Sequence, residues 1–283
     1  MSANELLSLS QIIGTGLQNE RCKIELARRS GDGFFWQMKG QASGVGVWCS
    51  YNDWQQLVEH YSALPDPSVL PDELLACVSA ILFEPVGDWL GELLEESPVS
   101  MVLADDIYPF MSFDDYGCAF LQVPVNLYQD MITQWSPFRG QEPLVELSLV
   151  AGYIEQSSED YHRVQVSEGQ WLKGDVKPEQ GQSILWWDRP IAVVSLDDID
   201  VNGIIIEQMS HKLNFVHPPL VAKLASIELS LAQIGSMMEG DRLSGDMNMY
   251  SQAQLTHGDE IAATGTLMRG RGGLLIQIEE YFH

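Results

Sequence analysis

The second half of the chain carries a dense series of short β-type segments, and this pattern constrains the fold more than any other feature. From about Pro143 onward, short apolar runs alternate with turn residues and polar stretches. Short strands at close spacing, separated by turns, are typical of a small β domain. The sequence predicts strands over 144–150, 164–166, 184–187, 191–196 and 204–207. We therefore expect a β-rich domain over residues 143–212.

A stiff break at His217-Pro218-Pro219 separates this domain from a second compact unit over 218–283. Two consecutive prolines fit neither a helix interior nor a central strand. In this unit, Ser230 and Gln233 form a capping box that starts a short helix reaching about Met238, and Gly240 ends it. Strands are predicted over 220–229, 246–250, 253–257, 260–268 and 274–281. Because so small a unit buries little surface, pairing with a partner would stabilise it.

The first 140 residues have a different, α+β character. Strands are predicted over 23–28, 34–38, 44–50, 101–104 and 118–123, and helices over 53–60, 71–82 and 88–95. Asn52 or Asp53 is the expected cap of the first helix, with Trp54, Leu57 and Val58 on one face. Pro71 opens the second helix, since proline fits the first turn. The pattern does not assign a topology to this region.

The chain is strongly acidic. Fifteen Lys and Arg stand against 40 Asp and Glu, which gives a net charge of −25, and no basic residue lies between Lys39 and Arg139. Nucleic acids are bound chiefly by Lys and Arg, so a nucleic-acid partner is excluded. An anionic membrane surface is disfavoured for the same reason. A basic protein partner fits this charge, and an acidic surface that only keeps the protein soluble stays open as the alternative.

The cysteines and the N-terminus indicate a reduced, cytosolic protein. Cys22, Cys49, Cys77 and Cys118 form no C-x-x-C pair, so they match neither a zinc site nor a disulfide scaffold. The first residues lack the basic and apolar regions of a secretory signal. No apolar run reaches the roughly 18 to 20 residues that span a bilayer, so we expect no direct membrane insertion.

The sharpest motif is the string from Asp198 to Gly203, DIDVNG, which matches the first six positions of a calcium-binding EF-hand loop. The twelfth position, which should be a bidentate Glu, is Met209, and the flanking residues are β-branched rather than helical. We therefore interpret the string as a hairpin turn in which Asn202 and Gly203 supply positive φ angles.

The search for catalytic groups finds no site. The doublets Asp105-Asp106 and Asp114-Asp115 are interpreted as solvated loop acids, since adjacent strand residues point to opposite faces. The six histidines show no metal-ligand spacing, and no nucleophile elbow or P-loop is present. The sequence thus predicts a protein without catalytic residues, metal or cofactor.

The C-terminal unit resembles a SpoA domain, the surface-presentation-of-antigens module. The resemblance rests on four motifs in order across about 60 residues: Leu229–Ile234, Gly240-Asp241, Ile261–Met268 and Gly273–Ile278. One departure is Ser244-Gly245-Asp246, which interrupts the strand that follows in the family. More faintly, the stretches 147–154 and 165–172 are similar to a first SpoA-like domain, with Gln170 where the family often has aspartate.

Two SpoA-type units behind a divergent N-terminal region resemble the layout of the cytoplasmic ring, or sorting-platform, protein family of type III secretion systems. The flagellar motor-switch relatives fit less well. The resemblance implies an α+β N-terminal region (1–140) followed by two small β-rich SpoA-type domains (143–212 and 218–283). It implies no enzyme but a scaffold at the cytoplasmic face of the bacterial inner membrane, beneath the injectisome.

The resemblance also implies partners. The SpoA-type units would pair with each other, and the pair would bind the stator protein of the export ATPase, while the N-terminal region would bind the membrane-ring adaptor. An internal start, for which Met209 is one position, would supply a separate C-terminal fragment. Apolar residues alternating with polar ones on this unit would form the pairing surface. The residues assigned to it are Leu229, Leu231, Ile234, Leu255, Ile261, Gly265, Leu267, Leu274, Ile276 and Ile278.

Three alternatives stay open at this point. The pairing residues could instead form an ordinary monomeric core. The chain could be a stand-alone acidic binding module or a chaperone for a basic partner. It could also be a metal-dependent hydrolase that uses one of the aspartate doublets, which a metal-induced shift in melting temperature would reveal.

Overall fold

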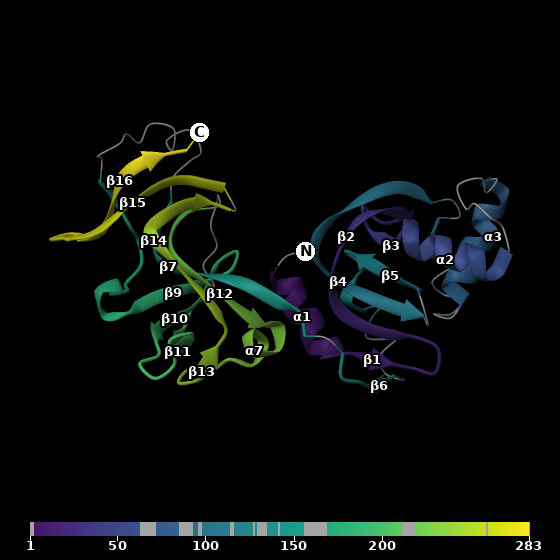
Figure 1. Cartoon of the computed structure of the whole chain (residues 1–283), viewed down its shortest axis with the longest axis horizontal. Coiled ribbons are helices and arrows are strands. Elements are labelled where there is room, and N and C mark those ends of the chain that lie inside the picture. Colours follow the sequence, from purple (N-terminus) through teal and green to yellow (C-terminus); the bar gives the residue numbers. More distant parts are fainter. Residues whose placement is uncertain are drawn as a thin grey trace. The chain divides into compact units, whose positions relative to one another are not determined.

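The fold is that of a computed structural model of the whole chain (Figure 1). It describes residues 3–62, 72–84, 93–95, 98–113, 116–126, 128, 135–140, 142–155, 169–210, 219–258 and 260–282. The chain divides into two compact units, Met1–Pro143 and Leu144–His283. Strands dominate both units and a few short helices accompany them, which agrees with the predicted α+β class. The predicted helix over 88–95 lies largely, and the predicted strand over 164–166 entirely, outside the described residues.

The first unit is a strongly curved sheet with helices beside it. Its order is β3-β5-β4-β2-β1-β6, and β3 also pairs with β2, so that β2, β3, β5 and β4 close into a ring. The elements are α1 (Ala3–Ile13), β1 (Leu17–Gln18), β2 (Lys23–Gln37), β3 (Gly46–Ser50), α2 (Tyr51–Ser62), α3 (Asp72–Phe83), β4 (Val99–Phe113), β5 (Tyr116–Leu121) and β6 (Ser136–Pro137).

Two of the predicted strands are one long strand in the structure. The segments expected over 23–28 and 34–38 join as β2, because the ladder to β4 shifts register between Arg29 and Gly31 instead of breaking. Gly31 has a φ of 114°, a conformation open to glycine, so the chain bulges there and continues as a strand. Gly33 allows the ring to close, since a Cβ at this position would lie 2.2 Å from the carbonyl oxygen of Cys49.

Helix α2 has the predicted buried face but not the predicted cap. Trp54, Leu57 and Val58 are buried, as expected. The cap is Ser50, whose hydroxyl accepts a hydrogen bond of 3.0 Å from the amide of Asp53. The expectation of Asn52 or Asp53 was therefore wrong, because the helix begins at Tyr51, directly after β3. Helix α3, over Asp72–Phe83, confirms the predicted second helix, while its expected opening residue Pro71 lies outside the described residues.

The second unit is built on one ten-stranded sheet of order β13-β11-β10-β9-β7-β12-β14-β15-β16-β8. Its strands are β7 (Leu144–Ile154), β8 (Gly169–Trp171), β9 (Gln182–Trp186), β10 (Pro190–Leu196), β11 (Gly203–Met209), β12 (Leu220–Ser230), β13 (Arg242–Ser244), β14 (Asp246–His257), β15 (Glu260–Gly270) and β16 (Gly273–Tyr281). A 3-10 turn (Pro178–Gln180) and helix α7 (Leu231–Ser236) complete it. The sheet is continuous because β12 pairs with β7 on one edge and with β14 on the other.

The local predictions for this unit are largely confirmed. The amide of Gln233 donates to the hydroxyl of Ser230 at 3.2 Å, and the Gln233 side chain accepts from the amide of Ser230 at 2.8 Å, which is the predicted capping box. The helix ends at Ser236, earlier than expected. The strands predicted over 246–250 and 253–257 are one strand, β14.

The DIDVNG string forms the predicted hairpin turn between β10 and β11, but with different backbone angles. Neither Asn202 nor Gly203 has a positive φ. Gly203 is closely packed instead, since a Cβ there would lie 3.0 Å from the Cβ atoms of Asp197 and Asp200. The loop is longer than a two-residue hairpin turn, so it does not need the left-handed conformation.

Candidate functional site

The second unit consists of two halves, residues 144–210 and 219–282, which exchange strands. The short strand β13 comes from the second half but pairs with β11 of the first half. In the opposite direction, β8 comes from the first half and pairs with β16 of the second half. The sheet has one edge built by the first half and one built by the second, and the outermost strand at each edge comes from the other half. Neither half is therefore complete alone.

Further backbone hydrogen bonds continue the β11–β13 and β16–β8 pairings beyond the strands themselves. Beside β13, the amide of Ile206 donates to the carbonyl of Asp241 at 2.9 Å, and the amide of Gly240 donates to the carbonyl of Ile206 at 2.8 Å. Beside β8, the amide of Leu172 donates to the carbonyl of Leu274 at 2.9 Å. These bonds satisfy main-chain groups that would otherwise lie at open sheet edges.

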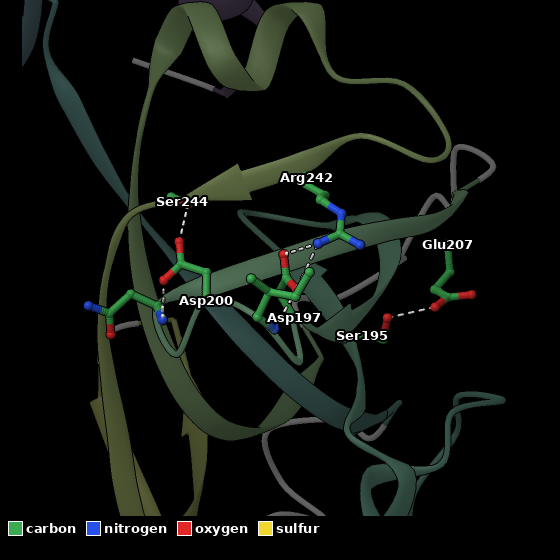
Figure 2. Close-up of polar contacts among 8 residues, drawn as sticks. Ser195, Asp197, Asp200, Glu207, Arg242 and Ser244 are labelled. Carbon is green, nitrogen blue, oxygen red and sulfur yellow. Dashed lines mark hydrogen bonds and ion pairs between the residues drawn. The ribbon is translucent and has the colours of Figure 1, made fainter.

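The exchange of β13 is held by an ion pair with one nearly buried partner (Figure 2). The Nη1 atom of Arg242 donates to both carboxylate oxygens of Asp197 at 3.1 Å. The Asp197 side chain is 5% exposed, whereas that of Arg242 is 55% exposed. The Asp197 carboxylate also accepts from the amide of Ile199 at 2.9 Å. Hydrogen bonds from both halves therefore offset the desolvation of this carboxylate.

Asp200 makes a second polar contact between the halves (Figure 2). Its carboxylate accepts a short hydrogen bond from the hydroxyl of Ser244 and another of 3.0 Å from the amide of Asn202. These bonds hold the pKa of Asp200 below its ordinary value, the Ser244 hydroxyl contributing most. The carbonyl of Asn202 accepts from the amide of Gly245 at 3.2 Å. The loop over 197–203, which includes the string that matches the first half of an EF-hand loop, therefore makes the polar contacts that hold β13.

The exchange of β8 is held by different contacts. The ring of Trp171 lies beside the turn between β15 and β16, where a Cβ on Gly270 would come within 2.8 Å of it. Arg269 pairs with Glu179 at 3.3 Å and donates to the carbonyl of Val176 at 3.4 Å. An aromatic side chain and an arginine therefore anchor this end of the sheet across the two halves.

The apolar core is also shared between the halves. One buried cluster combines Ala151, Ile154 and Leu172 of the first half with Leu220, Ala222, Ala253, Leu255, Ala262, Ala263, Leu274, Ile276 and Ile278 of the second. A smaller cluster packs Val221 of the second half against Val150, Val176, Ile184 and Trp186 of the first. Separating the halves would expose both clusters to water.

The structure places the ten predicted pairing residues mostly inside this unit. Leu229, Leu231, Ile234, Leu255, Gly265, Leu274, Ile276 and Ile278 are buried. Leu267 is partly buried and packs on the shared core, and Ile261 is 42% exposed. Their observed contacts lie within one chain, so pairing with a second chain stays a prediction.

The other candidates from the sequence are dispersed. Asp105 pairs with Arg28 at 3.5 Å, and Asp106 accepts from the amide of Ile107 at 2.7 Å. The doublet Asp114-Asp115 lies outside the described residues. Across the part of the chain that the structure describes, no three His, Cys, Asp or Glu side chains are grouped closely enough to hold a metal ion. All four cysteines are free thiols.

Sequence reasoning missed a pocket of about 470 Å³ in the first unit. Buried Trp48 and Phe110 line it, together with Arg29, Ser30, Ser50, Asp53, Ser112, Tyr116 and Gly117. The guanidinium of Arg29 lies 3.9 Å from the centre of the Phe110 ring. Burial raises the pKa of Asp53, while the hydrogen bond with Ser50 and the charge of Arg29 oppose that shift. The pairing of β2, β3, β4 and β5, together with the start of α2 directly after β3, brings these residues together.

Sequence reasoning also missed the pair of Asp197 and Arg242, although one signal was available. Arg242 is one of few cations in the chain, and it stands two residues before Ser244-Gly245-Asp246, where the sequence departs from the SpoA pattern. That departure is the junction between β13 and β14. Gly245 is required there, because a Cβ would lie 2.1 Å from the carbonyl oxygen of Glu228.

Comparison with known proteins bears on the first unit. None of the described helices is both long and apolar enough to cross a membrane. No curated protein matches the chain. Residues 2–117 match a family model described as the SepQ protein N-terminal domain. The match covers α1 through the start of β5 and points to a protein associated with type III secretion.

Proposed function

We propose that this protein is a non-enzymatic scaffold of the type III secretion sorting platform, the cytoplasmic ring at the inner membrane. The two halves of the second unit act as paired SpoA-type domains. The first unit binds the membrane-ring adaptor, and the paired halves bind the stator protein of the export ATPase. The chain thereby links the membrane ring to the ATPase.

The observation that carries this proposal is the exchange of β8 and β13 between the halves. Exchanged edge strands, shared apolar clusters and the Asp197–Arg242 pair support one rigid, composite platform rather than two separate modules. A rigid surface built from two halves suits a protein that holds partners in fixed positions. The match of residues 2–117 to the SepQ N-terminal domain supports a role in type III secretion.

The charge distribution supports partners that carry basic segments. The net charge of −25 favours association with positively charged protein surfaces and raises the encounter rate with them. It also disfavours nucleic acid and anionic lipid. The proposal places the protein in the cytoplasm, bound to other proteins of the apparatus, without cofactor or metal.

A secretion assay in the host bacterium tests the proposal. Deleting the gene should abolish the appearance of type III substrates in the culture medium, and the full-length chain should restore it. The Arg242→Ala variant should restore less, whereas the matched variant Arg271→Ala should restore as much as the wild type. Unchanged secretion in the deletion strain would contradict the proposal.

A pull-down of the full-length chain separates the scaffold from a general acidic binding module. We expect the stator protein and the membrane-ring adaptor to be retained at 0.5 M salt, because packed interfaces resist screening better than surface charge does. Capture of basic proteins at low salt alone would favour the acidic binding module.

The proposal extends to a second product of the gene. Met209 ends β11, so an internal start there would yield a fragment that holds β12 to β16 and α7 but lacks β8. Such a fragment would need the first half of another chain to complete its sheet. Changing the Met209 codon and blotting with an antibody against the C-terminus should remove a small band, and an unchanged band would show that the fragment does not start at Met209.

A further inference from the structure

Two buried thiols face each other in the first unit. Cys49 lies on β3 and Cys118 on β5, and the antiparallel ladder of these strands places the two residues directly opposite each other. Both are free cysteines, 0% and 1% exposed. Cys22 is also buried but hydrogen-bonds to Asn19, and Cys77 is exposed.

The position of the two thiols fits a cross-strand disulfide. Directly opposed residues of an antiparallel pair have Cα atoms about 4.5 or 5.5 Å apart, depending on their place in the hydrogen-bond pattern. Both values fall within the range of about 4.4–6.8 Å found for disulfides. Opposed side chains also project from the same face of the sheet, so the sulfur atoms point into the same region of the core.

We propose that Cys49 and Cys118 form a site of reversible oxidation, at which a small-molecule disulfide converts the two thiols into a disulfide bond. One cysteine, as the thiolate, attacks the small disulfide, which forms a mixed disulfide and releases one small thiolate. The second cysteine, again as the thiolate, attacks the protein sulfur of the mixed disulfide and expels the second small thiolate. Two electrons pass from the cysteines to the oxidant, and the two cysteine protons end on the released small thiols.

The bond would lock the ring of strands in the first unit. The ladder between β3 and β5 is one of the four pairings that close the ring of β2, β3, β5 and β4. A covalent link there would enclose residues 50–117, and long enclosed loops give the largest reduction in unfolded-state entropy. Oxidation should therefore stabilise the first unit. This effect is separate from the proposed role of the unit in binding the membrane-ring adaptor.

Burial makes the reaction slow in the closed structure. The hydrogen bond with Cys118 and burial together raise the pKa of Cys49 well above its ordinary value, so little thiolate is present. Reaction should require transient opening of the unit. The site would thus respond to prolonged oxidation, or to oxidation during folding, and not to brief exposure.

Incubation of the full-length protein with oxidised glutathione tests the inference. One sample contains no denaturant and one contains urea just below the unfolding transition, which increases opening. After the free thiols are alkylated, peptide mapping by mass spectrometry should find the Cys49–Cys118 linked peptide, earlier in the urea sample. The linked protein should melt about 5 °C higher than the reduced protein, and dithiothreitol should reverse the shift.

Single cysteine variants show whether the disulfide forms between Cys49 and Cys118 and not between other thiols. Cys22→Ala removes another buried thiol and should leave the link intact. Cys49→Ala should stop at a glutathione adduct on Cys118, and Cys118→Ala provides the same test if the first variant does not fold. The inference is overturned if the urea sample yields no linked peptide. A linked protein that melts below the reduced protein would overturn it equally, since the native ladder would then not accommodate the bond.

Discussion

The Nη1 atom of Arg242 lies 3.1 Å from both carboxylate oxygens of Asp197, and this contact joins two segments 45 residues apart. It links β13 in the second half of the second unit to the loop after β10 in the first half. The Asp197 side chain is almost fully buried. Because a buried carboxylate without partners is costly, the pair favours the exchanged arrangement of β13 over a detached one.

Replacing Arg242 with alanine should loosen the exchange of β13. Asp197 would keep its hydrogen bond from Ile199 but lose its cation, so we expect the free energy of unfolding to fall by about 1–3 kcal/mol. Urea denaturation followed by tryptophan fluorescence measures this change. Arg271→Ala, at an exposed position in the turn after β15, should change stability by less than about 0.5 kcal/mol. Equal losses in both variants would argue against a specific role for the pair.

The stability of the second unit should depend on Asp200 in acid. The folded-state pKa of Asp200 lies below its ordinary value of 3.8, since the Ser244 hydroxyl and the Asn202 amide stabilise its ionised form. Its stabilising contribution is therefore present above pH 3.8 and is lost as the pH falls through the folded-state pKa. The melting temperature of the wild type should decrease more steeply with acid than that of Asp200→Asn.

The neighbouring variant Asp198→Asn is the control for this pH effect. Asp198 is exposed and shares the same loop. Melting curves between pH 6 and pH 3 should keep the wild-type slope in this variant. If Asp200→Asn and the wild type lose stability in parallel, the contact with Ser244 does not contribute to the acid response.

Two isoleucines of the predicted pairing set should respond differently to truncation. Ile276 is fully buried in the cluster shared by both halves, whereas Ile261 is 42% exposed. We expect Ile276→Ala to lower the free energy of unfolding by about 2–5 kcal/mol, through lost burial and a residual cavity. Ile261→Ala should cost less than about 1 kcal/mol in the isolated protein.

The same two variants separate folding from partner binding. If Ile261 contacts a second chain, Ile261→Ala should weaken self-association or stator capture while the melting temperature stays unchanged. Size-exclusion chromatography with light scattering measures the first effect. A large loss of stability in Ile261→Ala would show instead that this residue belongs to the monomer core.

A methyl group at Gly265 should disrupt the sheet. A Cβ there would lie 2.1 Å from the carbonyl oxygen of Gln277 on the paired strand β16. Gly265→Ala should therefore separate β15 from β16 and cost about 1–3 kcal/mol, measured by thermal unfolding. Gly235→Ala is the matched control, because no heavy atom lies within 4 Å of the added Cβ and alanine favours the helix α7 that contains it. A stable, unchanged Gly265→Ala protein would contradict the packing at this ladder.

Local sequence signals predicted local structure well. The capping box at Ser230 depends on two residues three positions apart, and it appears as expected. The strands of the second half of the chain depend on short apolar runs between turns, and those in the described residues are present. Helix α1 was not predicted, although Leu6, Leu9 and Ile13 follow a helical spacing and are buried.

The errors arose where neighbouring elements override a local preference. Separate strands were predicted over 23–28 and 34–38, but the ladder to β4 continues β2 through a bulge near Gly31. Ser50, rather than Asn52 or Asp53, caps α2, because β3 leads directly into the helix. The glycine in Asn202-Gly203 suggested positive φ angles, but neither residue has one, and Gly203 instead packs closely against Asp197 and Asp200.

The sequence by itself determined the local elements, the acidic charge and the resemblance to SpoA domains, because each depends on residues close together in the chain or on composition alone. Only the tertiary structure decided that β8 and β13 cross between the halves, that Asp197 meets Arg242, and that Cys49 lies opposite Cys118. These contacts join segments separated by tens of residues. Their formation depends on which strand edges remain open once the central strands have paired, and no local pattern encodes that choice.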